Sequence, residues 1–322
     1  MGEFELIRRY FAAAPCAQGG EGVALGIGDD CALLEVPSGQ QLAVSTDTLV
    51  AGVHFPNACD ARLLGQRSLA VAASDLAAMG AEPVAFTLAL TLPEVSASWL
   101  QAYAEGLQRM AGHCRLSLIG GDTTRGPLSI TVTVFGRVPS GQALRRSGAR
   151  PGDLLCVGGC LGNAAGALPL VLGERQAPVE QAEPLLAQYW APQPQFALGL
   201  ALRGRATAAL DISDGLLADC GHIAKASGVA LEVNLAQVPV SPALQAFLGR
   251  EAAWQAALSG GDDYVLAFTL PAQQLAGLAQ AGFSEVKVIG QVCEGQGVTL
   301  RDAEGRDITP RQRGYQHFRE TP

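Results

Sequence analysis

The feature that most constrains this chain is a recurring pattern in which an apolar run is followed directly by glycines or hydroxyls and by aspartates. The clearest case is residues 26–55, where the pair Asp29 and Asp30 follows two glycines and Ser45–Asp47 follows an apolar run. Polar side chains at strand ends face outwards, and carboxylate and hydroxyl oxygens are the ligands that Mg²⁺ prefers. Because protein-bound Mg²⁺ commonly holds substrate phosphates, the stretch predicts a magnesium-nucleotide site.

Each aspartate taken alone is more simply explained as a turn or helix-cap residue. The pattern returns, however, at residues 120–124 (GGDTT), 211–215 (DISDG) and 259–264 (SGGDDY). Carboxylates that converged without cations would repel one another. The repetition therefore favours several Mg²⁺ ions that bridge a polyphosphate.

The first half of the chain predicts alternating helices and strands. The expected helices are residues 3–13, 60–79 (N-cap Asp60, C-cap Gly80) and 96–113, and the expected strands are 42–49, 84–91, 116–119 and 129–138. We expect Tyr103 on the surface or edge of its helix, and residues 120–124 as a turn in which glycines allow close approach to a ligand. The order predicts an α+β sandwich with helices on one face. Asp75, among small apolar neighbours, is either a ligand or a solvent-facing residue.

Residues 139–153 are rich in Gly, Ser, Arg and Pro and indicate a domain boundary, which gives domains at 1–140 and 150–322. Arg145, Arg146 and Arg150 there are either a solvated linker or a clamp for phosphates. The second half predicts strands at 154–157, 207–212 and 265–269 and helices ending at Leu172 and Ser227. The glycine-rich turn at 158–162 lacks a second strand ending in an acid, so we do not interpret it as a dinucleotide fold.

Composition excludes several classes of protein. A net charge of −8 with a pI near 5.1 argues against a general nucleic-acid binder. The eight cysteines form no C-x-x-C pair, which is typical of a reduced cytosolic protein. The N-terminus lacks the apolar core of a secretory signal, and charged residues and a proline interrupt the longest apolar region, residues 69–92. We therefore expect a cytoplasmic protein without membrane or nucleic-acid partners.

The usual ATP and hydrolase motifs are also missing. The chain contains no G-x-x-x-x-G-K-[ST], protein-kinase H-R-D or D-F-G, G-x-S-x-G or H-E-x-x-H motif. A metal-rich, lysine-poor site remains, and it suits phosphoryl transfer, which depends on positioning and charge neutralisation more than on covalent chemistry.

Seven motifs together resemble the thiamine-monophosphate kinase family, within the superfamily of aminoimidazole ribonucleotide synthetase and selenophosphate synthetase: GIGDDCA, STDTLVAGVHF, SDLAAMGAEP, GGDTT, DISDGL, SGGDDY and GYQHF. The resemblance covers essentially the whole chain. It implies a two-domain, synthetase-like α+β (mixed α/β) fold, with an N-terminal mixed sheet that forms a homodimer and a C-terminal α/β sandwich. It also implies Mg²⁺-dependent, in-line transfer of the γ-phosphoryl of ATP to thiamine monophosphate.

The resemblance also implies roles for individual residues. The magnesium ligands would be Asp30, Ser45, Thr46, Asp47, Asp75, Asp122, Asp211 and Asp214. ATP would contact Tyr103, Gly121, Asp122, Arg146 and Ser213, and thiamine phosphate would contact His54, Asp262 and Phe318. The family usually has Glu where Asp262 stands, and Asp reaches less far. Asp29, Asp263 and Tyr315 would be supporting residues, and no general base is assigned, since a phosphate acceptor is already ionised.

Two alternatives stay open. A related synthetase of the superfamily would act on another small acceptor. Against selenophosphate synthetase, no Cys or Lys lies in the N-terminal glycine loop; against the hydrogenase-maturation relative, the sequence ends RETP without a terminal cysteine. From a different class, the chain would be a non-catalytic magnesium-nucleotide sensor.

Overall fold

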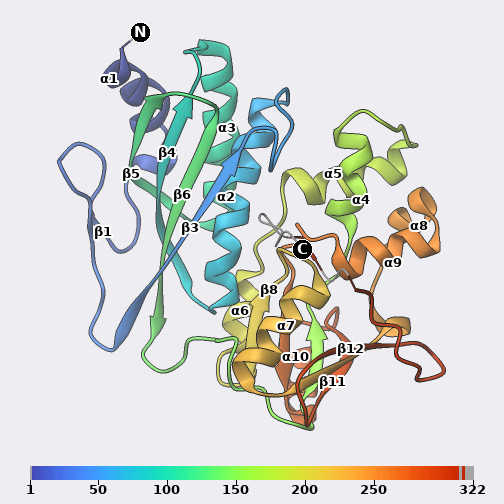
Figure 1. Ribbon diagram of the computed structural model, residues 1–322. Coiled ribbons are helices and arrows are strands. Elements are labelled where there is room, and N and C mark those ends of the chain that lie inside the picture. Colours follow the sequence, from blue (N-terminus) through green and yellow to red (C-terminus); the bar gives the residue numbers. More distant parts are fainter. Residues whose placement is uncertain (1, 312–313, 316–322) are drawn as a thin grey trace, which may run out of the picture. The chain divides into compact units, whose positions relative to one another are not determined.

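Two large β-sheets organise the computed structural model, which describes residues 2–311, 314 and 315, and each sheet belongs to a separate unit of the chain. Unit 1 comprises residues 2–76, 81–141 and 190–196. Unit 2 comprises residues 77–80, 142–189, 197–311, 314 and 315. Figure 1 shows the course of the chain through the elements of both units.

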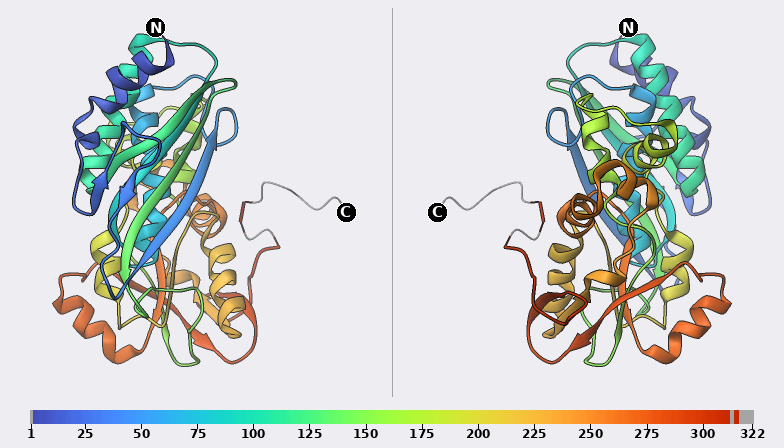
Figure 2. Two further views of the ribbon diagram at one scale, coloured as in Figure 1. Left: turned by 90° about the vertical axis from the view of Figure 1, so that its left-hand side faces the viewer. Right: turned by 90° about the vertical axis from the view of Figure 1, so that its right-hand side faces the viewer.

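Unit 1 is built on a four-stranded mixed sheet. Its main elements are β3 (Gln40–Val50), α2 (Ala61–Ala78), β4 (Glu82–Leu92), α3 (Ala97–Cys114), β5 (Ser117–Arg125) and β6 (Ser129–Pro139). The strands lie in the order β3-β6-β4-β5, and only β4 and β5 run parallel, because α3 carries the chain back between them. Figure 2 shows these long strands side by side from two further directions. The predicted β-α-β-α-β-β order and the mixed sheet are confirmed.

The helices α2 and α3 lie on one side of this sheet (Figure 1). Along β6 the side chains of Ile130, Val132 and Val134 are fully buried, whereas the threonines between them are not, which is the alternation expected of a strand with one covered face. Asp60 caps α2 by accepting from the amides of Arg62 and Leu63 at 2.7 and 3.1 Å. This cap confirms the predicted helix start.

The chain before β3 adds short elements to unit 1. A helical segment begins with α1 (Glu3–Leu6) and continues as the π-helix η1 (Ile7–Ala12), and it is followed by the 3₁₀ turn η2 (Pro15–Ala17). β1 (Val23–Leu25) and β2 (Leu33–Leu34) then form a two-stranded antiparallel sheet. The segment that carries Asp29 and Asp30 connects these two strands.

The GGDTT motif is not the turn that the sequence suggested, because β5 continues through it as far as Arg125. Its residues pair in register with β4, Gly121 opposite Leu88 and Asp122 opposite Ala89. A Cβ atom at Gly121 would overlap the backbone oxygen of Leu88. The glycine is therefore required by the approach of the neighbouring strand.

Unit 2 contains a six-stranded sheet in the order β12-β9-β11-β7-β10-β8, antiparallel except for the pair β12 and β9. The strands are β7 (Leu154–Val157), β8 (Ala208–Asp211), β9 (Ala230–Asn234), β10 (Leu266–Leu270), β11 (Lys287–Cys293) and β12 (Gly297–Arg301). The helical segments are α4 (Asn163–Val171), α5 (Val179–Trp190), α6 (Phe196–Leu202), α7 (Leu216–Ser227), η3 (Leu235–Gln237), α8 (Pro242–Leu248), α9 (Arg250–Ser259) and α10 (Ala272–Gln280). Sequence reasoning did not anticipate α5, α6, α8 and α9.

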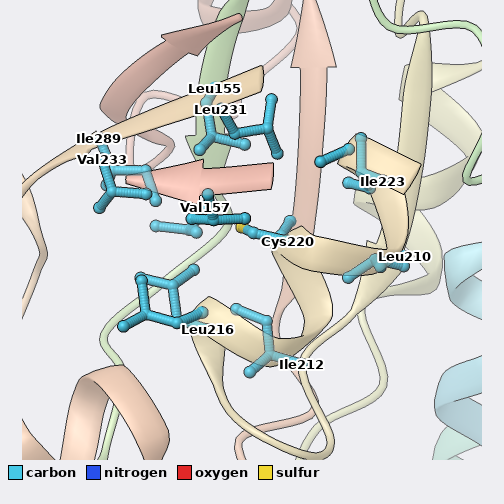
Figure 3. Packing of buried hydrophobic residues seen from close by; sticks show 14 of the residues in the cluster. Leu155, Val157, Leu210, Ile212, Leu216, Cys220, Ile223, Leu231, Val233 and Ile289 are labelled. Atoms are coloured by element: carbon cyan, nitrogen blue, oxygen red, sulfur yellow. The ribbon is translucent and has the colours of Figure 1, made fainter. Parts of the chain in front are cut away.

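The helix α7 packs against the sheet of unit 2 (Figure 3). Its residues Leu216, Cys220 and Ile223 are fully buried with aliphatic residues of β7, β8, β9 and β11. This core fixes the start of α7 beside the end of β8, which are joined by the predicted acidic turn. Within the described residues, no helix has both the length and the apolar character needed to cross a membrane.

Candidate functional site

A pair of carboxylates lies between β3 and α2 in unit 1. The hydroxyl of Ser45 donates a hydrogen bond to Asp75, and Asp47, two residues further along β3, lies close enough to Asp75 for the two charges to interact. Burial and the charge of Asp75 raise the pKa of Asp47 from 3.8 to about 6. Asp47 forms no ion pair with any described residue. A divalent cation would remove the repulsion, and oxygen ligands of this kind suit Mg²⁺.

The neighbouring Thr46 does not join this group. Side chains alternate along a strand, so Ser45 and Asp47 share one face and Thr46 lies on the other. There its hydroxyl lies 2.9 Å from that of Thr133, and Thr48 and Thr131 form a second such pair at 2.8 Å. The Thr46 hydroxyl therefore lies on the face of β3 opposite Asp47, and the role of Thr46 as a magnesium ligand stays a prediction.

Two further predicted magnesium ligands of unit 1 are exposed. Asp29 accepts a hydrogen bond from the amide of Asp30 at 2.8 Å, which stabilises the turn between β1 and β2. The carboxylates of Asp30 and of Asp122, on the edge strand β5, accept no hydrogen bond from described residues. Both are open to a ligand, and the structure shows no contact that joins them to Asp47.

His54 lies in the turn that follows β3. Its Nδ1 accepts a hydrogen bond from the amide of Val50 at 2.9 Å, so the ring proton of the neutral form resides on Nε2. The guanidinium of Arg67, only 2% exposed, donates to the carbonyl of His54 at 3.4 Å. The turn thus holds the imidazole in one orientation, with Nε2 as a donor.

Tyr103 lies elsewhere than predicted. Its side chain is completely buried, its ring stacks on Trp99 at 5.0 Å between centroids, and its hydroxyl lies 3.0 Å from that of Ser68. Burial raises the pKa of the phenol well above its ordinary value. The side chain is enclosed between α2 and α3, so the predicted surface or edge position is wrong, while the contact of Tyr103 with ATP stays a prediction.

In unit 2, the turn from β8 to α7 is organised by a residue that sequence reasoning missed. Asp219, in the first turn of α7, accepts hydrogen bonds on one oxygen from the amides of Ser213, Asp214 and Gly215 at 3.1, 3.0 and 3.1 Å. Burial raises the pKa of Asp219 to about 7, although these amides oppose the shift. An acid in the first turn after a glycine N-cap was the available signal.

The SGGDDY loop lies directly against this turn. The amide of Asp262 donates to the carbonyl of Ser213, and that of Tyr264 donates to Ile212, both at 2.8 Å. Gly261, with φ of 73°, allows this approach, because a Cβ atom there would overlap the carbonyl of Ser213. The structure thus brings together Asp211 at the end of β8, Ser213, Asp214 and Asp262. The carboxylate of Asp262 accepts from the Tyr264 hydroxyl at 3.0 Å.

The second acid of that loop has a different environment. Asp263 is fully buried, and its two carboxylate oxygens lie 2.8 and 2.9 Å from the amide nitrogen of Gly162. Burial raises the pKa of Asp263 well above its ordinary value. The bond occupies the last amide of the glycine-rich turn before α4. This amide is therefore not free to bind a phosphate.

Two other predicted regions belong to unit 2. The amide of Tyr315 donates to the carbonyl of Asp214 at 3.0 Å, so the C-terminal segment reaches the same turn, whereas Phe318 lies outside the described residues. The carbonyl of Arg146 accepts from the Ser227 hydroxyl at 3.1 Å, while its side chain is exposed. The arginine segment is therefore an ordered part of unit 2 and not a free linker.

Comparison with known proteins gives two matching family models and close relatives. Residues 28–138 match the model of the AIR synthase related protein, N-terminal domain, and residues 150–303 match that of its C-terminal domain. The chain is 46% identical to thiamine-monophosphate kinase of Escherichia coli strain K12, over 98% of each chain. It also resembles the crystal structure of thiamine-monophosphate kinase from Stenotrophomonas maltophilia K279a, with a TM-score of 0.82 and 48% identity over 87% of this chain and 91% of that one. A structure of AaThiL complexed with AMPPCP and TMP gives a TM-score of 0.79 at 29% identity, over 88% and 89%.

Proposed function

The chain belongs to the thiamine-monophosphate kinases, within the AIR synthase related proteins, and we propose that it transfers the γ-phosphoryl group of ATP to thiamine monophosphate. The products are thiamine diphosphate and ADP. Identity over nearly the whole length of curated relatives supports this activity, as does the relative that was solved with AMPPCP and TMP. The single observation of this chain that carries the proposal is the half-buried pair Asp47 and Asp75. The two negative charges repel each other, and a divalent cation would stabilise both.

Magnesium is the cation that best fits the donor set. On unit 1 the proposed ligands are Asp30, Ser45, Asp47, Asp75 and Asp122, and on unit 2 they are Asp211 and Asp214. All are hard oxygen donors, and Mg²⁺ held by a few carboxylates also binds phosphate oxygens. When bound, the ions neutralise the charge of the polyphosphate. Thr46 is left out of this set because its hydroxyl lies on the other face of β3.

The residues around the acids have proposed roles in binding substrates. Gly121, Asp122 and the exposed side chain of Arg146 are assigned to ATP, together with Ser213. On the acceptor side, His54 donates from Nε2 to the phosphate of thiamine monophosphate, and Asp262 and Phe318 contact the thiamine part. A phosphate acceptor is ionised at neutral pH, so direct in-line transfer needs positioning and charge neutralisation without a general base.

We also propose that the protein is a cytoplasmic homodimer formed through residues 1–140, while residues 150–322 supply the remaining ligands. The face of the unit 1 sheet opposite α2 and α3 exposes 41% of Leu42 and 54% of Val44, which is unusual for a sheet left in water. A second copy would cover these side chains. Val44→Glu is expected to give a monomer in multi-angle light scattering, and a dimer of unchanged mass would contradict this assignment. All eight cysteines are free, as in reduced compartments.

The activity is tested by phosphorus NMR of the protein with ATP, Mg²⁺ and thiamine monophosphate. We expect the thiamine diphosphate signals to grow with those of ADP, and chelation of Mg²⁺ by EDTA to stop both. Absence of thiamine diphosphate would refute the kinase activity. Nucleotide binding without turnover would identify a magnesium-nucleotide sensor, and turnover with another acceptor would identify a related synthetase.

A further inference from the structure

The loop of residues 260–264 in unit 2 holds its backbone in a rare conformation. Asp262 and Tyr264 have φ of 62° and 50°, in the left-handed region that residues with a Cβ atom seldom adopt. In the described part of the chain, the third non-glycine residue with such a φ is Arg115, which ends α3, where left-handed residues are common. The two strained residues of the loop persist only because the contacts around them enforce their geometry.

Two of these contacts hold Asp263, which lies between the strained residues. The amide of Gly162 binds its buried carboxylate, and Nε2 of Gln188 donates a hydrogen bond to its carbonyl oxygen at 2.6 Å. Gln188 is half-buried on α5, 75 residues away in the sequence. Gly162 therefore fixes the side chain of Asp263, whereas Gln188 fixes its backbone.

The peptide group between Asp263 and Tyr264 is thus held at both ends. Gln188 binds its carbonyl oxygen, and its N–H donates to the carbonyl of Ile212 at 2.8 Å. Rotation of a peptide plane changes the φ of the residue that follows it. Without Gln188, one of the two hydrogen bonds that oppose this rotation is lost, and Tyr264 can relax towards negative φ.

This relaxation would reach Asp262 through the side chain of Tyr264. The hydroxyl of Tyr264 donates to Oδ1 of Asp262 at 3.0 Å, so the tyrosine keeps the carboxylate in one orientation. A change in the φ of Tyr264 would swing its ring and withdraw the donor. A chain of contacts therefore runs from α5 to the carboxylate of Asp262.

We propose that Gln188 is a positioning residue that orients the carboxylate of Asp262 for the acceptor. This inference rests on the proposed function, in which Asp262 contacts the thiamine part of thiamine monophosphate. A carboxylate held in one orientation is a pre-organised acceptor for N–H donors, such as the amino group on the pyrimidine ring of thiamine. Gln188 thus acts on the affinity for the acceptor and not on the transfer of the phosphoryl group.

The test uses Gln188→Met in the full-length protein, because Met has a similar length and no N–H donor. Calorimetric titration with thiamine monophosphate and initial rates at varied concentrations of each substrate are measured. We expect the Kd and KM for thiamine monophosphate to rise about tenfold, while kcat and the KM for ATP stay within about twofold. Gln188→Arg restores a planar N–H donor and should return the KM to within about threefold of the wild type. A purely structural role would instead lower the urea midpoint and raise both KM values together.

Two further variants examine the chain of contacts. Tyr264→Phe removes only the hydroxyl and should raise the KM for thiamine monophosphate as Gln188→Met does. The double variant should show no further rise, because both residues act on Asp262 through the same contacts. Gln181→Met is the matched control, since Gln181 lies two turns earlier on α5 and its side chain forms no hydrogen bond with the described residues. Its KM values should equal those of the wild type.

Two kinds of failure are distinguishable. An unchanged KM for thiamine monophosphate in Gln188→Met, or additive effects in the double variant, would overturn this inference and leave the kinase activity intact. A wild type that neither binds nor phosphorylates thiamine monophosphate would refute the proposed function, and this inference with it.

Discussion

Two pairs of acids, Asp47 with Asp75 in unit 1 and Asp219 with Asp263 in unit 2, are stabilised in opposite ways. In unit 1, Asp47 faces Asp75 and accepts no hydrogen bond from described residues, so its charge is opposed by its neighbour. In unit 2, Asp219 and Asp263 are more deeply buried, yet backbone amides hold both. A cation would stabilise the first environment, whereas backbone amides already satisfy much of the second.

This difference separates two roles that a strand-end aspartate can have. A carboxylate that accepts hydrogen bonds from several backbone amides holds a turn in place, and its removal leaves those amides unpaired. A carboxylate that faces another carboxylate destabilises the metal-free fold and is retained for what it binds. Substitution should therefore reduce activity at Asp47 and stability at Asp219 and Asp263.

The largest expected effect is that of Asp47→Asn. We expect kcat to fall by more than about 100-fold, since a metal ligand that acts in the transition state is lost. The free energy of unfolding without Mg²⁺ should stay the same or rise, because the repulsion from Asp75 disappears. Coupled ADP release and urea denaturation measure the two quantities.

The matched control for Asp47→Asn is Asp60→Asn, because Asn caps α2 as well as Asp does. Its kcat should stay within about twofold of the wild type. Near-normal turnover in Asp47→Asn would show that Asp47 is not a metal ligand in the active site.

Asp263→Ala is the complementary test in unit 2. The substitution leaves the buried amide of Gly162 without its acceptor, so we expect the free energy of unfolding to fall by about 2 kcal/mol in urea denaturation. Asp263→Asn keeps one acceptor oxygen, so its free energy of unfolding should fall by less. A variant as stable as the wild type but unable to bind ATP would show that Asp263 is a ligand, contrary to the comparison.

The pH dependence of stability tests Asp47 without relying on turnover. Its pKa is raised from 3.8 to about 6, so the folded protein holds the proton at a pH where the unfolded chain has released it. The stabilisation is complete below about pH 4 and is lost as the pH rises through about 6. Without divalent cations, the wild type should therefore lose up to about 2 kcal/mol relative to Asp47→Asn between these values. Mg²⁺ should reduce the loss, and a pH-independent difference would contradict the raised pKa.

Local pattern predicted most of the first half of the fold, because strand alternation and helix caps depend on neighbouring residues. Asp60 and Ser96 begin their helices as expected. The positions of two predicted site residues also follow from local pattern. Tyr103 lies three residues after Leu100 and four before Leu107, so helical spacing already placed it on the buried face. Period-two alternation likewise separates Thr46 from its neighbours.

Of the unit 2 acids, Asp263 was beyond local pattern and Asp219 was not. Asp263 pairs with Gly162, which is 101 residues away in the sequence, so this contact depends on how distant loops pack. Asp219 accepts hydrogen bonds from amides only four to six residues earlier, in a turn where Gly215 adopts φ of 119°. The sequence thus located the acidic loops, but it did not reveal which aspartates bind ligands and which hold backbone.

His54 combines both roles in one side chain. Its Nδ1 accepts a hydrogen bond from a backbone amide, as Asp219 and Asp263 do, so Nε2 carries the ring proton and can donate. We expect His54→Asn to raise the KM for thiamine monophosphate about tenfold, the value of one hydrogen bond to a charged group, with the KM for ATP unchanged. Initial rates at varied concentrations of each substrate measure this. A higher KM for ATP instead would mean that the two pockets are assigned in reverse.

The smallest expected effect separates the two faces of β3. Thr46→Val keeps the shape of the side chain and removes only the contact with Thr133, so kcat should change by less than about twofold. Ser45→Ala removes the donor to Asp75 on the other face, and kcat should fall about tenfold because the carboxylate pair loses a neutral hydrogen-bond donor. Steady-state rates at saturating Mg²⁺ compare the two variants. If Thr46→Val lowered kcat more than Ser45→Ala, the cation would lie on the opposite face of the sheet. The assignment of Ser45 and Asp47 to the metal-binding face of β3 would then be wrong.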